Sequence, residues 1–399
     1  MATLRRGRHF FAGPGPTNIP DPVLRAMDRP TIDFNDPEFL AVFDRAVAGL
    51  KRILGTSGHV FLYAASGHGA WEGTMLNLFS PGERVLMVES GYFSEAWGLL
   101  SAKHGILVET VAADWRRGVE VGAIAERLAA DRGQQIRAVC AVHNETLTGV
   151  RLPLGEIRAA LDAAGHPALL LADTISSLGS MEFAMDAGGI DAVVGGSQKG
   201  LMLPAGMSFT AVSAKALAAS AKATLPRHYF DWRMMIERRH GGFVGTVPVG
   251  FFYGLDEAVR RIEEEGLAAV LARHHRLAEA VRRAVAAWTG NAGPEIFCTD
   301  AARRSDSVTT VLLGEGVDAE AVRTVALERF NVGLGSGLGR LNGRVFRIGH
   351  LGDLNEPMVL GTLGAVEMAL GLAGVPHARG GVAAAMEWLA RGEAGDNSS

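Results

Sequence analysis

The chain has 399 residues, of which 48% are hydrophobic and 21% charged, and its formal net charge is −4. This length predicts two globular domains, and the small negative charge excludes a strongly basic nucleic-acid-binding surface. The two cysteines exclude a disulfide framework and are typical of a reducing compartment, so we expect a cytoplasmic protein. No apolar run reaches the roughly 18 residues of a membrane span, and neither end carries a secretory or peroxisomal signal.

The first segment with a clear pattern is rich in proline and glycine. Residues 12–20 read AGPGPTNIP, which excludes a helix or a central strand and indicates an ordered arm or an entry loop. A helix is predicted from Pro37 to Leu54, because Asp36 is a good N-cap and Gly55 a good stop signal.

Strand patterns and helix patterns then alternate as far as residue 212. Short β-rich runs predict seven strands, at 59–63, 84–89, 106–112, 136–142, 168–173, 190–194 and 207–212. The segments between them predict helices at 70–78, 94–103, 121–130 and 154–164. This order predicts an α/β fold with a mostly parallel seven-stranded sheet and helices on both faces.

The pattern changes after residue 212. A short helix is predicted at 215–223, no regular element at 228–250, and a long helical run at 256–288 that is interrupted near Gly266. Strands at 307–313 and 344–348 with helices at 319–330 and 356–372 predict a smaller α+β domain. We therefore divide the chain into an N-terminal arm at 1–20, a large cofactor-binding domain at 21–258, a small domain at 259–390 and a flexible tail at 391–399.

Two ionisable residues follow neighbouring strands of the predicted sheet. Asp173 ends the run ALLLAD, and Lys199 follows the run IDAVVGG. The edge past the strand ends is where open α/β sheets bind ligands. An acid and a lysine placed there suit pyridoxal phosphate, which needs a lysine for a Schiff base and an acidic partner for its ring nitrogen. The alternative is a surface lysine and a helix-capping aspartate, and this pair alone does not decide between the two.

Three further segments beside strands carry candidate ligand-binding groups. Residues 65–72, ASGHGAWE, follow the first strand and open a helix, so Ser66 and the backbone there could bind a phosphate; the alternative is a tight βα turn. The aromatic Phe93 follows the next strand and could stack on a flat ring or belong to the core. Residues 143–150, HNETLTGV, end the fourth strand with polar side chains that a buried strand end does not carry without partners.

Arg347 is the cation of the predicted strand VFRIG, and a buried arginine on a strand needs an anionic partner. A substrate carboxylate is one candidate, and an internal ion pair with Asp353 is the other. The glycine-rich run at 333–339 does not match a dinucleotide loop, and His274 and His275 point in different directions on a helix, which argues against a shared metal. No nucleophile elbow of the form GxSxG occurs.

Together, the segments SGHGAWE, HNETLTGV, LLLADTISSLGS, GGSQKG and VFRIGHLGD resemble the class V branch of the fold-type I pyridoxal-phosphate transaminases. The alanine–glyoxylate and serine–glyoxylate aminotransferases are the most similar members. The resemblance implies that Lys199 is the Schiff-base lysine, that Asp173 faces the ring nitrogen and that Arg347 binds the substrate α-carboxylate. It also implies a set of further cofactor contacts, namely Ser66, Gly67, His68 and Gln198 at the phosphate, Phe93 and Thr146 at the ring, and Thr246 at the phosphate of a neighbouring subunit. A homodimer with shared active sites is therefore implied.

The resemblance implies transfer of an amino group from a small amino acid to glyoxylate, which gives glycine and a 2-oxo acid. Serine is the favoured donor and alanine is possible, whereas aspartate or hydroxyaspartate is the alternative. The chain departs from bacterial relatives at Asp33-Phe34-Asn35 and at Gly245-Thr246-Val247-Pro248, both of which border the substrate entrance in the family. Rival classes are a nicotinamide-dependent dehydrogenase, for which the early GxGxxG loop is missing, and a non-catalytic protein with the same fold.

Overall fold

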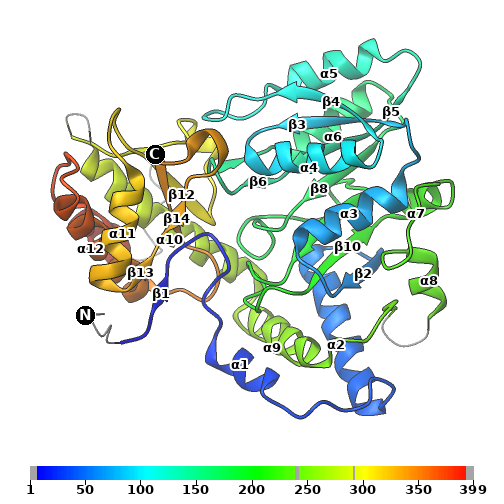
Figure 1. Ribbon diagram of the computed structural model, residues 1–399, viewed down its shortest axis with the longest axis horizontal. Helices are drawn as coiled ribbons and strands as arrows, with labels where there is room; N and C mark the ends of the chain where they lie inside the picture. Colours follow the sequence, from blue (N-terminus) through cyan, green and yellow to red (C-terminus); the bar gives the residue numbers. More distant parts are fainter. Residues whose placement is uncertain (1–6, 239–241, 291–292, 392–399) are drawn as a thin grey trace.

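Two β-sheets, each with its own helices, organise the chain (Figure 1). The structure is a computed structural model that describes residues 7–238, 242–290 and 293–391. The predicted tail lies, beyond Arg391, outside these residues. No helix within the described ranges is long and apolar enough to cross a membrane.

The larger sheet has seven strands, as predicted, in the order β2-β10-β9-β8-β5-β3-β4. Only β10 runs antiparallel to its neighbours β2 and β9, so the sheet is mostly parallel. The strands are β2 (His59–Tyr63), β3 (Arg84–Glu89), β4 (Leu107–Ala112), β5 (Ile136–Val142), β8 (Leu169–Asp173), β9 (Ala192–Gly196) and β10 (Ser208–Val212). The carboxyl ends of β5, β8 and β9 therefore lie beside one another.

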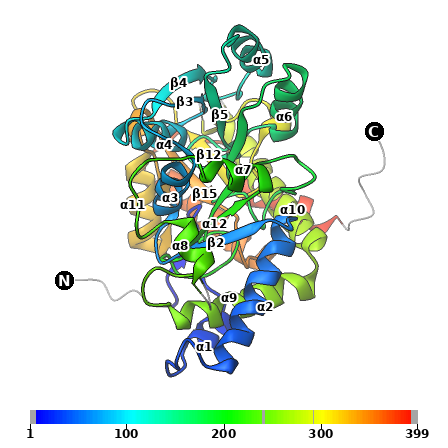
Figure 2. The ribbon, with the colours of Figure 1, turned by 90° about the vertical axis from the view of Figure 1, so that its right-hand side faces the viewer.

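Helices cover both faces of this sheet because apolar side chains alternate along its strands. In β2, Val60 and Leu62 pack into one core, whereas Phe61 and Tyr63 pack into the other. The first core is covered by α2 (Pro37–Leu54), α5 (Val121–Ala130), α6 (Leu154–Ala163) and α9 (Val249–Glu265). The second core is covered by α3 (Gly67–Leu78), α4 (Tyr92–Lys103), α7 (Ala214–Ser220) and α8 (Trp232–Glu237). Helices α2 and α9 lie side by side in both views (Figures 1 and 2).

The second sheet has four strands in the order β11-β12-β15-β14. These are β11 (Glu295–Ile296), β12 (Val308–Leu312), β15 (Val345–Gly349) and β14 (Gly335–Ser336). A third core joins it to α10 (Leu267–Thr289), α11 (Ala319–Phe330), α12 (Glu356–Leu372) and α13 (Gly381–Ala390). The first core extends along the chain to Val270, so the division at residue 258 stays a prediction.

The N-terminal arm runs between the two sheets. Its strand β1 (Phe10–Phe11) pairs in parallel with β13 (Val332–Gly333). Further on, the amide of Thr17 donates to the carbonyl of Gln198 at 3.0 Å, which attaches the arm to the loop after β9. The arm is followed by α1 (Asp21–Met27), which packs on α9.

The expected helices and strands form within a few residues of their predicted ends, and several further elements were missed. Helix α9 begins at Val249 rather than at residue 256, and α8 lies in the segment for which no element was predicted. The hairpin of β6 (Asn144–Glu145) and β7 (Val150–Arg151), helix α13 and the 3-10 turns Ala301–Arg303 and Gly339–Leu341 were also missed. The glycine-rich run at 333–339 contributes to β13, to β14 and to the first residue of the 3-10 turn Gly339–Leu341, and it does not open an α-helix.

Candidate active site

A cavity of about 120 Å³ opens where β5, β8 and β9 end. It is lined by Ser66, Gly67, His68, Trp71, Phe93, Val142, Asn144, Thr146, Asp173, Ile175, Ser176, Gln198 and Lys199. Three larger hollows, of about 660, 600 and 220 Å³, contain neither Asp173 nor Lys199. The predicted acid and the predicted lysine thus face one common cavity, although they come from different strands.

Lys199 lies in the turn after β9, and its Nζ donates a hydrogen bond to the carbonyl of Pro14 at 2.7 Å. Burial is the largest cause that lowers the pKa of the Lys199 amine, and the positive charge of Arg347 adds to it; against the opposing charge of Asp173, the result is a pKa of about 8. A large share of the amine is therefore neutral near pH 8, and a neutral amine is what a base or a nucleophile requires.

Asp173 is the last residue of β8 and only 4% exposed. Its Oδ2 accepts a hydrogen bond from Trp71 Nε1 at 2.8 Å, and its Oδ1 accepts one from the amide of Ile175 at 2.7 Å. Burial raises the pKa of the carboxyl to about 6, against these two donors and the charge of Lys199, all of which favour the carboxylate. Asp173 is consequently ionised at neutral pH and can hold a cationic or N–H group.

The start of α3 forms another wall of the cavity. Ser66 is the N-cap of this helix, and its side chain makes no capping hydrogen bond, so the hydroxyl is available. A side chain at Gly67 would force Ile175 to move, because its Cβ would lie 2.3 Å from Ile175 Cδ1. Backbone N–H groups at a helix start attract anions, and His68 and Gln198 line the same cavity. Gln198 Oε1 is buried without a hydrogen-bond partner among the described residues.

Arg347 lies on β15 and is 8% exposed. It donates from Nε to the carbonyl of Ser336 at 2.8 Å and from Nη1 to the carbonyl of Thr146 at 3.1 Å. Burial lowers the pKa of the guanidinium to about 10. No ion pair of Arg347 occurs within the described ranges, and Asp353 instead pairs with Arg261 at 3.1 Å, so the alternative of an internal pair with Asp353 is wrong.

The predicted residues differ in how they relate to the cavity, and Arg347 is not among the residues that line it. Phe93, at the start of α4, lines it and packs edge-on against Tyr92 with ring centroids 5.4 Å apart. Thr246 is exposed and does not line it. A role for Thr246 toward a neighbouring subunit stays a prediction.

Glu145 is a buried carboxyl that the sequence did not single out. Its Oε2 accepts from the amides of Phe93 at 3.1 Å and Ser94 at 3.3 Å, and its Oε1 accepts from the amide of Leu147 at 3.2 Å. Burial raises the pKa of Glu145 to about 7. The polar strand end HNET indicated buried partners, but it did not show which residue ties the start of α4 to the site. Trp71 and Asn144 were missed for the same reason.

The part of the chain that the structure describes contains no cluster of side chains suited to hold a metal ion. No group of three or more His, Cys, Asp or Glu side chains gathers there with the geometry of a metal site. His274 Nε2 accepts a hydrogen bond from the amide of Gly352, and His274 Nδ1 is hydrogen-bonded to the carbonyl of Val270, whereas His275 Nδ1 contacts the carboxylate of Asp306. The two histidines therefore serve different partners.

Comparison with known proteins agrees with this geometry. The family described as aminotransferase class-V matches residues 46–340. The chain belongs to the class-V aminotransferases. This aminotransferase is 45% identical to the L-aspartate–glyoxylate aminotransferase of Paracoccus denitrificans, over 94% of each chain. It is 43% identical to the serine–glyoxylate aminotransferase of Methylorubrum extorquens, over 97% of this chain and 98% of the relative.

Among solved structures, the fold resembles ureidoglycine–glyoxylate aminotransferase from Bacillus subtilis with a TM-score of 0.89. That match has 26% sequence identity and covers 98% of this aminotransferase and 100% of the other chain. The α/β architecture predicted from the sequence is thereby confirmed as that of the fold-type I aminotransferases.

Proposed function

We propose that this aminotransferase uses pyridoxal phosphate to move an amino group from a small amino acid to glyoxylate, which gives glycine and a 2-oxo acid. One observation carries the proposal: Lys199 and Asp173, from the ends of neighbouring strands, line the same cavity. A lysine and an acid at one ligand are the requirements of this cofactor.

The residues of the cavity fit the cofactor at each of its polar groups. The carboxylate of Asp173 suits the ring nitrogen, and the start of α3, with Ser66, Gly67 and His68, suits the phosphate. Thr146 and the unpartnered Gln198 Oε1 provide buried polar atoms that a bound ligand can satisfy. Phe93 provides an aromatic wall for the ring.

When bound, pyridoxal phosphate supplies an electron-accepting ring that stabilises the negative charge left at the substrate Cα after proton removal. Lys199 Nζ is the base that takes this proton, because its lowered pKa makes it neutral near pH 8. Asp173 holds a proton at the ring nitrogen by remaining ionised at neutral pH. Arg347 orients the substrate by binding its α-carboxylate, since the guanidinium is buried and unpaired with any acid in the described residues.

Serine is the favoured amino donor, and alanine is possible. Relatives named serine–glyoxylate aminotransferase are 40–43% identical over nearly the whole chain. The aspartate-using relative is 45% identical, which supports aspartate or hydroxyaspartate as the second candidate donor. Comparison of kcat/KM for serine, alanine, aspartate and hydroxyaspartate, each with glyoxylate, separates these candidates.

The decisive experiment is an absorbance spectrum of the purified protein with pyridoxal phosphate. We expect a visible band that bleaches when serine or another accepted donor is added, and Lys199→Ala should abolish turnover, with a loss of roughly 10⁴-fold or more. A Lys199→Ala protein that still transaminates would refute the assigned role. If the protein shows no such band, the remaining candidates are a dehydrogenase and a non-catalytic binding protein.

Three further assignments rest on the resemblance and on composition. A homodimer with shared sites would bring the exposed Thr246 of one subunit to the phosphate of the other. A cytoplasmic location agrees with the two unpaired cysteines, Cys140 and Cys298. The division into an arm, a large domain and a small domain agrees with the separate hydrophobic cores of the two sheets.

A further inference from the structure

Asn144 has a side-chain amide whose orientation the surrounding hydrogen bonds determine. Ser176 Oγ donates to the carbonyl of Asn144 at 3.0 Å, which uses its single hydrogen. Ser176 Oγ must therefore accept hydrogen bonds from its two other partners, Thr146 Oγ1 at 2.8 Å and Asn144 Nδ2 at 2.9 Å. The nitrogen of the amide thus faces Ser176, and Asn144 Oδ1 is left buried without a partner in the described part of the chain.

The second hydrogen of the Asn144 amide is held by the other sheet. Asn144 Nδ2 donates to Ser307 Oγ at 2.8 Å, and Ser307 directly precedes β12 of the four-stranded sheet. Both residues are nearly inaccessible, at 2% and 0% exposed. Because Asn144 lines the cavity and Ser307 does not, this bond joins the cavity wall to the second sheet.

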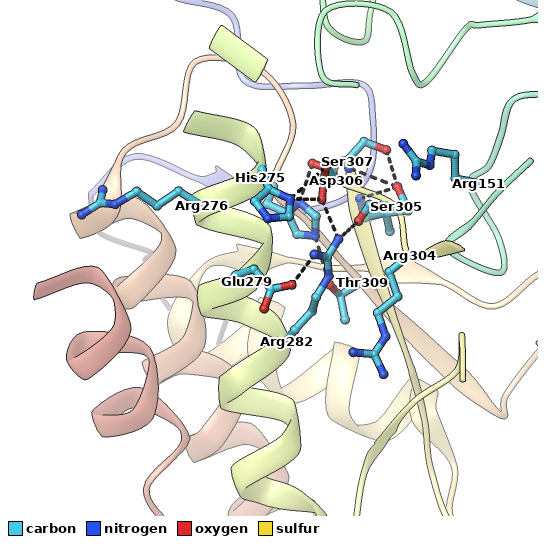
Figure 3. Close-up of polar contacts among 12 residues, drawn as sticks. Arg151, His275, Arg276, Glu279, Arg282, Arg304, Ser305, Asp306, Ser307 and Thr309 are labelled. Carbon is cyan, nitrogen blue, oxygen red and sulfur yellow. Dashed lines mark hydrogen bonds and ion pairs between the residues drawn. The ribbon is translucent and has the colours of Figure 1, made fainter. Parts of the chain in front are cut away.

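The turn that carries Ser307 is itself firmly held (Figure 3). Ser305 Oγ accepts from the amides of Ser307 at 3.1 Å and Val308 at 3.3 Å. Arg282 of α10, 5% exposed, donates to the carbonyl of Ser305 and, at 2.7 Å, to Asp306 Oδ1. A buried arginine that binds a backbone carbonyl and a carboxylate fixes the turn.

We propose that Ser307 is a positioning residue for the cofactor cavity. Ser307 holds the side-chain amide of Asn144 so that Asn144 Oδ1 remains available as a buried acceptor. Because this hydrogen bond joins the two sheets, the packing of the second sheet against the cavity and the binding of the cofactor depend on each other. The inference rests on the proposed function, because the group that Asn144 Oδ1 awaits is a hydrogen-bond donor of the bound ligand. Ser307 acts only through Asn144 and does not touch the ligand.

A double-mutant cycle on the affinity of the cofactor-free protein for pyridoxal phosphate tests this route. The dissociation constant is measured by absorbance titration for wild type, Ser307→Ala, Asn144→Ala and the double variant. We expect Ser307→Ala to weaken binding about five- to tenfold and Asn144→Ala by at least as much, as loss of a buried hydrogen bond implies. Because Ser307 acts through Asn144, the double variant should match Asn144→Ala within about twofold.

Ser208→Ala is the matched control. Ser208 on β10 is also a buried serine, but its Oγ has no partner in the described residues, so its removal breaks no hydrogen bond. The dissociation constant of Ser208→Ala for pyridoxal phosphate should equal that of wild type. Ser305→Ala, which releases the amides of Ser307 and Val308, gives a second route to the same turn should Ser307→Ala fail to fold.

Hydrogen exchange at the amides of Ser307 and Val308 gives a readout independent of affinity. Cofactor binding should slow this exchange in wild type and leave it unchanged in Asn144→Ala. Additive losses in the cycle, or slowed exchange in Asn144→Ala, would overturn the positioning role while the proposed function stands. Wild-type protein that shows no spectral response to pyridoxal phosphate would overturn the proposed function, and this inference with it.

Discussion

The amine of Lys199 donates a hydrogen bond to the carbonyl of Pro14 over 2.7 Å, although 185 residues separate them. The arm therefore covers the lysine and removes it from water. Burial is the largest cause of the lowered pKa of Lys199, so the arm contributes to the reactivity of the amine. The proline- and glycine-rich run permits this approach because it forms neither helix nor sheet at Pro14.

Gly15→Ala should disturb the lysine directly. Gly15 has φ of +115°, and an added Cβ would lie 2.4 Å from Cδ of Lys199. The methyl group would displace the side chain, so we expect kcat/KM for transamination to fall at least about tenfold, since small misplacements at a reacting group are costly. Gly82→Ala is the control, because Gly82 also has a positive φ, +82°, but nothing lies within 4 Å of its Cβ. Equal losses in both variants would show that backbone strain alone is responsible.

The charge of Arg347 should be visible in the titration of Lys199. The rate at which cofactor-free protein reacts with pyridoxal phosphate should rise with pH, with a midpoint near the Lys199 pKa of about 8, because only the neutral amine attacks. Arg347→Leu removes a repulsive positive charge and should move the midpoint to higher pH, whereas burial keeps it below the ordinary value of 10.5. Stopped-flow absorbance across pH 6–10 measures the midpoint.

Arg340→Leu serves as the control for this titration, since Arg340 is an exposed arginine that pairs with Glu89 and Glu95 and is not among the charges that lower the pKa of Lys199. Its midpoint should equal that of wild type. Arg347→Leu should also raise KM for the amino donor, because the guanidinium is the proposed carboxylate-binding group. A variant with an unchanged midpoint and an unchanged KM would remove Arg347 from the site.

Local signals in the sequence determined the elements that were predicted well. Helix α2 runs from Pro37 to Leu54 as predicted, because its N-cap Asp36 and its left-handed stop Gly55 are adjacent to it in sequence. Strands β2, β3 and β5 also have the predicted bounds, since their apolar runs are flanked by polar or turn residues. Each motif that follows a strand of the large sheet reached the cavity because parallel strands end at a common edge.

The partners of these motifs could not be predicted in the same way. Trp71 and Asp173 are 102 residues apart, and Asn144 and Ser307 are 163 apart, so their contacts depend on how helices and sheets pack. Helix α8 was missed because its six residues are too few to show a period, although Asp231 caps it. Arg347 illustrates the opposite case, since its burial followed from the strand pattern but the acid partner expected for it, Asp353, pairs with Arg261 instead.

Trp71→Phe should shift the pH dependence of cofactor binding. The indole N–H of Trp71 stabilises the carboxylate of Asp173, whose pKa is about 6, so its loss should raise that pKa by about one unit or more. Affinity for pyridoxal phosphate should therefore begin to fall at a higher pH as the solution is acidified. The ligand phosphate itself titrates near pH 6, so the difference between variants is the quantity to measure.

Trp97→Phe is the control for this shift. Trp97 stacks on Trp71 with ring centroids 5.8 Å apart, but its Nε1 has no hydrogen-bond partner in the described residues. This substitution changes the packing of the same aromatic pair and leaves Asp173 untouched, so its pH profile should match that of wild type. A shift of equal size in both variants would assign the effect to packing.

Glu145→Gln should change the pH dependence of stability. The pKa of Glu145 is raised from 4.5 to about 7, so the protonated carboxyl is favoured in the folded state. Its contribution to the free energy of unfolding is complete below pH 4.5 and is lost as pH rises through 7, with a maximum size of about 3 kcal/mol. Glutamine does not titrate. Its side-chain NH₂ group would face a backbone N–H that now donates a hydrogen bond to Glu145, and this clash of two donors lowers the free energy of unfolding by about 1–3 kcal/mol.

The stability gap between wild type and Glu145→Gln should therefore be largest near pH 5 and shrink toward pH 8. Denaturant unfolding of the cofactor-free proteins at pH 5, 6, 7 and 8 measures it. Asp173 titrates in the same range but is present in both proteins, so its contribution cancels to first order. A gap that stays constant across this range would mean that Glu145 is ionised throughout, and that the amides of Phe93 and Ser94 outweigh the cost of its burial.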